Sequence, residues 1–170
     1  NLDTLKCEDN FLVNLDVSNI AGLKYLSCSS NQLSYLDVTN CAELEYLKCG
    51  FNELTSLDVS TCAKLYYFVC WRNLLTALDL SDNADLKEVY CDNNQISSLS
   101  LPPGANLWTI CASSNQLTSL DVSTVSVINL LCGNNPLTSL DVSQNTFLWD
   151  LSCSNTQVSS LDVSNNMYLK

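Results

Sequence analysis

Residues 23–39 read LKYLSCSSNQLSYLDVT, and variants of this stretch recur along the whole chain. Around Leu26 and Cys28 apolar residues alternate with polar ones, which is the two-residue period of a β-strand. Asn31 comes three residues after the cysteine, and a second apolar segment then ends in Asp37. The stretch is one copy of the frame L-x-x-L-x-C-x-x-N-x-L-x-x-L-D-V-S. A single copy could not bury its apolar side chains, so the pattern predicts copies that stack on one another.

The copies follow one another at a nearly constant spacing. Six of their asparagines lie 21 residues apart, at Asn10, Asn31, Asn52, Asn73, Asn94 and Asn115. Asn135 follows after 20 residues, and Thr156 stands where the next asparagine belongs. We therefore expect residues 1–170 to form a single solenoid of eight repeats. The chain starts and stops within a copy and shows no polar capping unit, so we expect it to be a fragment of a longer protein.

The frame matches the leucine-rich repeat, L-x-x-L-x-L-x-x-N/C-x-L. Its 21-residue length and the cysteine in the third apolar position make it similar to the cysteine-ladder repeats of internalin J-like bacterial surface proteins. The resemblance implies an α/β-class horseshoe, wound as a right-handed superhelix with a parallel sheet on its concave face. It also implies an extracellular or cell-surface location, with the anchor outside this segment. It concerns scaffold positions only, so it assigns no binding residue.

The rest of each copy must return the chain along the convex side. About ten residues are available for this return, which is too few for a helix and its loops, so we expect extended segments and single 3₁₀ turns there.

The composition excludes several classes of function. The chain has 18 acidic and 7 basic residues, a net charge of −11, which would repel the phosphates of nucleic acid. Its apolar runs are only a few residues long, so we expect no membrane-spanning helix. It has no histidine, no nucleophile–base set and no glycine-rich phosphate loop. We therefore expect no enzyme, no catalytic residues and no cofactor.

The ten cysteines fall into three groups. Seven share the frame position and should stack about 4.8 Å apart, too far for a disulfide, so we interpret them as buried free thiols. A straight row cannot surround a metal tetrahedrally, so no metal site is expected. Cys41 and Cys62 form a separate convex pair, for which a disulfide stays open. Cys111 lies one residue before its frame position, so its side chain should point outward. It is the best candidate for a reactive thiol, and we expect it to have an ordinary pKa and no catalytic role.

Two polar rows accompany the cysteines. The frame asparagines should donate to a backbone carbonyl and accept from a neighbouring amide, so that each turn satisfies the next. Seven aspartates should also stack, at Asp16, Asp37, Asp58, Asp79, Asp121, Asp141 and Asp162. Bonding of each aspartate to its own turn, helped by the Ser or Thr two residues later, would offset their repulsion. Calcium along the row is the alternative.

The pattern breaks between Ser100 and Val127. The fifth copy replaces its usual return with Pro102, Pro103 and Gly104, and the sixth has Ala112 in place of the cysteine and a return that is one residue short. Because proline cannot donate a hydrogen bond, we expect local distortion or a change of curvature here, but no domain boundary.

Function should lie where the frame leaves freedom, at the x positions of L-x-x-L-x-C-x-x-N. These positions hold 9 of the 14 aromatic residues and the only arginine, although polar residues would suit an exposed strand equally well. Three tyrosines share one column, in which the rings should lie about 5 Å apart. Clustered Tyr, Trp and Arg are typical of binding hot spots. The candidate ligand-binding residues are Tyr25, Tyr46, Phe51, Tyr67, Trp71, Arg72, Tyr90 and Trp108.

These observations predict a non-enzymatic cell-surface module that binds a protein or carbohydrate ligand through the concave aromatic face. We expect a monomer that neither binds nucleic acid nor inserts into a membrane. The alternative is a structural spacer that holds other domains away from the surface, in which the stacked aromatics only stabilise the sheet.

Overall fold

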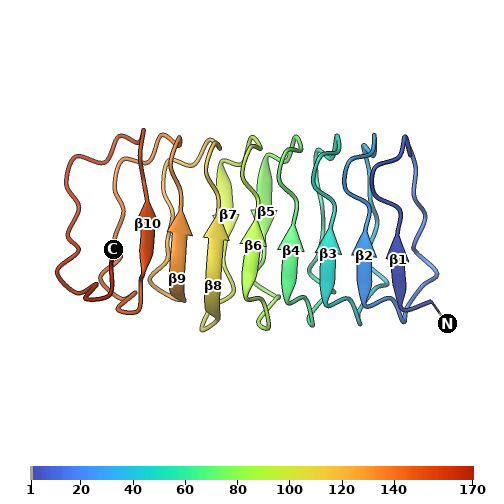
Figure 1. Cartoon of the computed structure of the whole chain (residues 1–170), viewed down its shortest axis with the longest axis horizontal. Helices are drawn as coiled ribbons and strands as arrows, with labels where there is room; N and C mark the ends of the chain where they lie inside the picture. The colour runs from blue at the N-terminus through green and yellow to red at the C-terminus, as the bar shows by residue number, and fades with distance from the viewer. Residues whose placement is uncertain (1) are drawn as a thin grey trace.

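The computed structural model describes residues 2–170, which form a solenoid built on one eight-stranded parallel sheet (Figure 1). We call each folded repeat a coil. The strands follow the order β1-β2-β3-β4-β6-β8-β9-β10, one from each coil. Their bounds are β1 Thr4–Lys6, β2 Tyr25–Ser27, β3 Tyr46–Lys48, β4 Tyr67–Val69, β6 Glu88–Tyr90, β8 Asn106–Cys111, β9 Ser126–Leu131 and β10 Asp150–Ser152.

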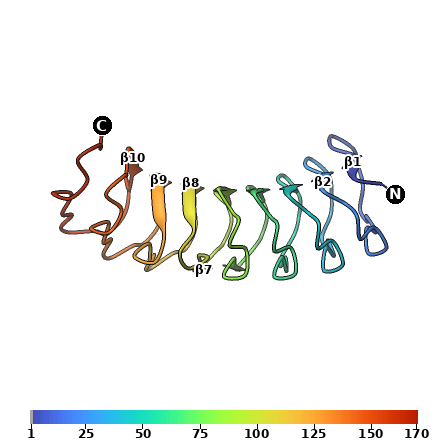
Figure 2. The same ribbon diagram turned by 90° about the horizontal axis from the view of Figure 1, so that it is seen from below.

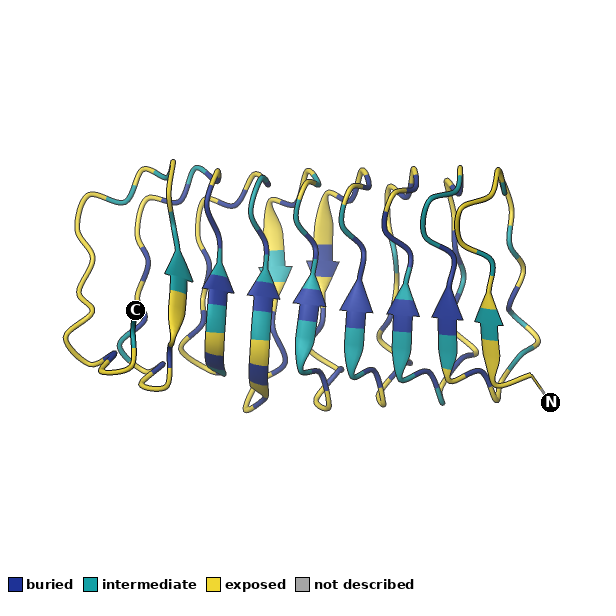
Figure 3. Ribbon diagram, viewed as in Figure 1, coloured by how far each residue is buried: buried dark blue, intermediate teal, exposed yellow. Residues whose placement is uncertain are grey.

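The register of the sheet follows the sequence repeat. Leu26 lies opposite Leu47, and Leu47 lies opposite Phe68, so equivalent residues of successive coils are direct neighbours. All three side chains are fully buried, and the residues on either side of them point away from the core. Figure 3 shows these inward positions as a buried row through the central coils, with more exposure at β1 and β10. The predicted parallel-sheet solenoid is confirmed.

The convex side returns the chain without any helix in residues 2–170 (Figure 2). Its turns are closed by bonds between residues three apart, such as the Ile20 amide to the Val17 carbonyl at 3.0 Å and the Leu23 amide to the Ile20 carbonyl at 3.0 Å. These are 3₁₀-type bonds, but they do not continue into 3₁₀ segments. The expected extended segments are also present, and two of them, β5 (Ala77–Asp79) and β7 (Ser98–Ser100), pair as a second, two-stranded parallel sheet that was not predicted.

The frame asparagines form the predicted ladder. The Asn73 amide nitrogen donates to the carbonyls of Cys49 in the preceding coil at 3.1 Å and Cys70 in its own coil at 3.0 Å. Its oxygen accepts from the Leu54 amide at 2.9 Å. At the last position, the Thr156 hydroxyl bonds only to the Cys153 carbonyl of its own coil, at 2.9 Å. The asparagines therefore bind each turn to the one before, and the threonine does not.

A second asparagine row, which the sequence analysis missed, lies under the convex turns. The Asn83 amide donates to the carbonyls of Val59 at 3.0 Å and Cys62 at 2.9 Å. Asn145 and Asn166 occupy the same position and make equivalent bonds. In earlier coils this position holds Cys41 and Cys62, whose thiols face the backbone carbonyls of the preceding coil. The convex cysteines are thus free thiols in the place of an amide, and the disulfide alternative is not realised.

The aspartates bind to their own turns, as predicted. Asp16 accepts from the Ser18 hydroxyl at 2.6 Å and from the Ser18 amide at 3.0 Å. The bond from the backbone amide recurs at all seven aspartates, and the bond from the hydroxyl recurs at Asp37 and Asp121. These bonds lower the pKa of the Asp16 carboxyl, with the serine hydroxyl as the largest cause. The pKa is also lowered at Asp37, where the Thr39 backbone contributes most and the neighbouring Asp16 acts in the opposite direction. Hydrogen bonding therefore outweighs repulsion between neighbours.

The irregular region keeps the sheet intact. Pro102 to Ala105 form a β-turn, closed by the Ala105 amide to the Pro102 carbonyl at 3.2 Å, with Gly104 at φ 77°. Only glycine adopts that conformation readily at this position of the turn. The chain leaves this turn extended, and β8 is six residues long where most strands have three. β9, which follows the shortened return closed by the Val125 amide to the Val122 carbonyl, is also six residues long. The predicted distortion is thus a lengthening of two strands.

Candidate ligand-binding site on the concave sheet

The tyrosine column, which we define as Tyr25, Tyr46 and Tyr67, lies in register on β2, β3 and β4. Ring centroids are 5.9 Å apart between the first pair and 6.1 Å between the second, with interplanar angles of 29° and 31°. The predicted column is confirmed, although its spacing exceeds the expected 5 Å because the rings tilt. Each ring is half-buried, so the column still exposes aromatic surface on the concave side.

The ring of Tyr90, on β6, contacts the last ring of the tyrosine column, although its register partner on β4 is Val69. Its ring lies 5.6 Å from that of Tyr67, and its hydroxyl donates to the Glu88 carboxylate at 2.5 Å. Burial, followed by this hydrogen bond, raises the pKa of Tyr90 well above its usual range. The tyrosine therefore stays a neutral donor at any physiological pH, and the bond fixes its ring.

Lysine side chains cover part of the tyrosine column. The Lys48 ammonium lies 5.3 Å from the ring centroid of Tyr67 and 5.8 Å from that of Tyr25, and Lys6 lies 5.3 Å from Tyr25. These distances are within the range of cation–π attraction. The column thus already attracts positive charge within the protein itself.

A second aromatic cluster lies at the carboxyl ends of β3 and β4. The rings of Phe51 and Trp71 meet edge to face at 4.7 Å. Arg72 follows Trp71 in the sequence, and its guanidinium lies 4.9 Å from the centroid of the Phe51 ring. A side chain at Gly50 would come within 2.4 Å of the Trp71 indole, so the glycine provides the space in which the indole lies.

The backbone of this second cluster is strained. In all eight coils the residue before the frame asparagine, or before Thr156, has a positive φ near 55°, and in the central coils this residue is Phe51 or Arg72. Asn and Asp tolerate this left-handed conformation best, and bulky side chains seldom adopt it. Strain of this kind collects at functional sites, where the side chain matters more than the local backbone energy.

Trp108 joins the column through a residue that the sequence analysis left out of the site. Tyr66 packs edge to face against Trp108 at 5.8 Å and lies 6.0 Å from Tyr46. Both Tyr66 and Trp108 occupy the first free position of the frame, so aligning that position across coils could have found the pair. We define the aromatic face as the eight predicted residues together with Tyr66. Trp108 is 46% exposed and Phe51 40%, so much of this apolar area meets solvent.

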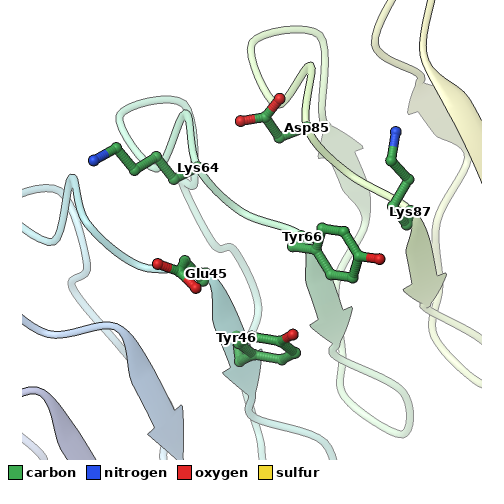
Figure 4. A pocket seen from close by; sticks show the side chains of 6 residues that line it. All are labelled: Glu45, Tyr46, Lys64, Tyr66, Asp85 and Lys87. Atoms are coloured by element: carbon green, nitrogen blue, oxygen red, sulfur yellow. The ribbon is translucent and has the colours of Figure 1, made fainter.

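Two hollows lie along the aromatic face. The larger, of about 510 Å³, is lined by Glu45, Tyr46, Lys64, Tyr66, Asp85 and Lys87 (Figure 4). Figure 4 shows the rings of Tyr46 and Tyr66 near the strands, with Lys64 and Asp85 on the loops above them and Glu45 and Lys87 closer to the rings. Lys64 is bound to Glu43 through contacts of 2.6 and 2.8 Å to its two oxygens. The smaller hollow, of about 270 Å³, lies between the tyrosine column and the second cluster and is lined by Tyr67, Val69, Trp71, Tyr90 and Asp92.

The structure corrects the expected reactivity of Cys111. The residue does lie on the concave side, opposite Tyr90 in register, but its thiol is half-buried. Burial and the nearby carboxylates, Asp92 first, raise its pKa to about 11 where an ordinary value was expected. The prediction missed this because the acids belong to other coils. The thiolate is scarce at neutral pH, so Cys111 is a poor nucleophile.

The described part of the chain, residues 2–170, contains neither a metal-binding cluster nor a membrane-spanning helix. No group of three or more cysteine, aspartate or glutamate side chains there could hold a metal ion. None of its residues forms a helix of the length and hydrophobicity needed to cross a bilayer.

Comparison with solved structures finds three informative likenesses. The functional domain of InlJ from Listeria monocytogenes, described as including a cysteine ladder, is 29% identical with a TM-score of 0.54, over 99% of this chain and 52% of that one. The leucine-rich repeat domain of APL1B is 21% identical with a TM-score of 0.79, over 98% of this chain and 52% of that one. A leucine-rich-repeat protein of Leptospira interrogans is 22% identical with a TM-score of 0.69, over 100% and 54%.

This chain spans about half the length of those proteins. No family model and no curated protein sequence matches it. The second and third likenesses establish the fold, and the first adds a cysteine ladder. In this chain five of the seven frame cysteines are buried free thiols, at Cys28, Cys49, Cys70, Cys91 and Cys132, whereas Cys7 and Cys153, in the first and last coils, are free thiols that are only half-buried. Burial, the largest cause, raises the pKa of Cys28 and Cys132 to about 12. The chain has the fold of a leucine-rich-repeat solenoid, and its row of frame cysteines makes it similar to the functional domain of InlJ.

Proposed function

We propose that this solenoid is a non-enzymatic recognition module that binds a protein or glycan ligand through the aromatic face. The observation that carries the proposal is a continuous chain of ring contacts from Tyr25 to Tyr90, half-exposed on a rigid parallel sheet. Aromatic side chains contribute large contact area at small entropic cost, because they have few rotatable bonds. A sheet whose backbone is fixed by the asparagine ladder holds them ready for a ligand.

Two energetically unfavourable features, strained backbone and exposed aromatic surface, support a binding role over a purely structural one. A scaffold needs no bulky side chain in the left-handed position of Phe51 and Arg72, where Asn134 and Asn155 serve the same turn in later coils. The face also leaves Trp108 largely exposed, although an exposed apolar patch invites aggregation unless a partner covers it. Both costs are explained if these side chains contact a ligand.

The proposal includes where the protein acts and its oligomeric state. The similarity to InlJ and its cysteine ladder supports a module displayed outside the cell. We propose that it acts there as a monomer and does not bind nucleic acid, since the net charge of −11 opposes phosphate binding.

A substitution experiment tests the proposal. Tyr46, Tyr67 and Trp71 are replaced together by alanine, and binding to a glycan array and to cultured host cells is measured beside a thermal melt. Removing three anchors should weaken binding by about a hundredfold or more while the melt shows a folded solenoid. The matched control replaces three exposed aromatics outside the strands of the sheet, Phe11, Tyr35 and Phe147, and should bind normally.

A structural spacer is the second candidate, and one observation favours it. The rings contact one another as well as solvent, and such stacking stabilises adjacent strands. A triple variant that binds cells and glycans as well as the parent, or a parent that binds neither, would establish the spacer and exclude the recognition module.

A further inference from the structure

We propose that the smaller hollow, between Tyr67, Trp71 and Tyr90, is an aromatic cage for an organic ammonium group. The inference rests on the proposed function and deepens it by naming the chemistry of one part of the ligand. We use the word cage for these three aromatic residues. The hollow measures about 270 Å³ and also contains Val69 and the Asp92 carboxylate.

The lining has the composition that binds such a cation. An ammonium group gains from the negative faces of surrounding rings, and most of all when it is shielded from water. Tyr67 and Tyr90 have centroids 5.6 Å apart at 45° to each other, so two rings converge on the hollow, and Trp71 forms another side. Val69 is only 8% exposed and provides an apolar surface that suits methyl groups.

The cage is held in place by contacts outside the hollow. The Trp71 indole lies over Gly50, where a Cβ would come within 2.4 Å of it, and against the edge of Phe51 at 4.7 Å. The Tyr90 ring is fixed by its hydroxyl bond to Glu88 at 2.5 Å. The walls therefore need no rearrangement to accept a ligand, which lowers the cost of binding.

The charges around the cage favour a cation on one side and oppose it on the other. One oxygen of Asp92 accepts from the Asn93 amide at 2.6 Å, and the other has no hydrogen-bond partner among residues 2–170. Opposite to it, the Lys48 ammonium lies 5.3 Å from the Tyr67 ring centroid. Lys48 shows that this ring attracts an ammonium group, and it is also a like charge that an incoming cation must tolerate.

The combination of three aromatic residues with a nearby carboxylate occurs at one place along the concave side of residues 2–170. The position of Trp71 is taken by Asp92, Ser113 and Gly133 in the next three coils. The position that holds tyrosine in β2, β3 and β4 holds Glu88 in β6 and Thr109 in β8. The cage is therefore a feature of the fourth and fifth coils rather than of the repeat frame, as expected of a ligand site and not of a scaffold.

Small probes test the cage directly. Choline is titrated against the protein while the Trp71 indole N–H signal is followed by NMR, with 3,3-dimethylbutan-1-ol as a neutral probe of the same shape. We expect saturable choline binding with a Kd of about 1–10 mM, and binding of the neutral probe about tenfold weaker. Trp71→Phe identifies the indole signal, and Trp149→Ala, an exposed tryptophan outside the aromatic face, should leave choline binding unchanged.

Two charge variants make the test sharper, because they preserve the aromatic walls. Asp92→Asn should weaken choline binding by about threefold to tenfold, and Lys48→Met should strengthen it by a similar factor. Neither change should alter binding of the neutral probe. Two larger probes then distinguish the sources of an ammonium group. Phosphocholine represents a lipid or polymer headgroup, and a peptide with Nε-trimethyllysine represents a protein side chain. Binding of either probe more tightly than choline supports the cage.

The proposal is overturned by any of three results. These are no saturable binding of choline, equal binding of the neutral probe, or a Kd that neither charge variant changes. Its failure can be told apart from failure of the recognition module. If the ammonium probes fail while the Tyr46, Tyr67 and Trp71 triple variant still loses cell or glycan binding, the cage is wrong and the recognition function stands.

Discussion

The turn at Asn73 and the turn at Thr156 occupy the same position in two coils but differ in what they hold together. Asn73 bonds to the backbone of its own coil and to Cys49 and Leu54 of the preceding one. Thr156 bonds only within its own coil. Next to Asn73 the chain displays Trp71 and Arg72, whereas the positions before Thr156 hold serine and asparagine.

The difference separates two roles of the coil. The asparagine fastens neighbouring coils, and the residues just before it are free to face a ligand. In the central coils both roles are filled, while the last coil lacks the fastening amide and has no aromatic residue at the two positions just before Thr156. Stability and recognition can therefore be changed independently, by substitutions one or two residues apart.

The largest effect is expected from removing the central asparagine. Asn73→Ala leaves the Leu54 amide without a partner in a buried turn. It also removes one of the two side-chain amide bonds that the Cys49 and Cys70 carbonyls each accept, the other coming from Asn52 and Asn94 respectively. The free energy of unfolding should fall by about 3 kcal/mol, since several buried hydrogen bonds are lost together. Urea denaturation followed by circular dichroism measures the loss. A loss below about 1 kcal/mol would show that the ladder is not what fastens the coils.

The reciprocal change should strengthen the last turn. Thr156→Asn restores an amide that can reach the preceding coil, and should stabilise it by about 1 kcal/mol, a typical net value for a hydrogen bond. Hydrogen exchange of amides in residues 150–157 should slow by about fivefold, with no change near Asn73. Unchanged exchange would mean that the last turn is limited by something other than its missing amide.

Acid should weaken the central and C-terminal coils alike, because both keep the aspartate turn. The pKa values of Asp58 and Asp141 are lowered by hydrogen bonds from Ser60 and Ser143. A carboxyl whose pKa is lowered on folding stabilises the fold above its unfolded pKa of about 3.9, and this stabilisation is lost as pH falls through the folded value.

The melting temperature should therefore drop steeply as the pH falls from about 5 to about 2. Asp58→Asn keeps an oxygen that accepts the hydrogen bond but cannot titrate, so its melting temperature should fall less over the same range. A variant that follows the parent curve would contradict the assignment.

The smallest effect concerns the left-handed position before each asparagine. Ser114→Asn should stabilise by about 0.5 kcal/mol, because asparagine tolerates the φ of 57° better. Asn155→Ser, at a φ of 54°, should lose a similar amount. Paired urea curves measure both. Shifts of the same sign would show that backbone strain does not decide this position.

The repeat spacing was enough to predict which residues become neighbours. The tyrosine column, the asparagine ladder, the aspartate turns and the buried thiols all follow from stacking identical frames in register. Sequence could not predict how Arg72 reaches the Phe51 ring, because that depends on the left-handed turn. It also missed the Asn83 row, since cysteines fill the same position in earlier coils and hide the pattern.

Sequence analysis was least successful for properties of one coil that depend on side chains or backbone of neighbouring coils. The raised pKa of Cys111 comes from burial and from carboxylates of other coils, above all Asp92, which no local pattern reveals. The sequence predicted extended returns, but it did not predict that Ala77–Asp79 and Ser98–Ser100 pair as strands β5 and β7, because the frame treats every return alike. Such effects depend on the three-dimensional path of the returns.

The constant register has a consequence for how such a chain can change over generations. Because each strand meets its neighbour at equivalent residues, a whole 21-residue unit could be duplicated, lost or exchanged by recombination with every backbone bond still finding a partner. One such event would bring a new pair of columns side by side. Deleting the unit that contains Trp71, for example, would set Tyr46 beside Glu88 and remove the cage in a single step.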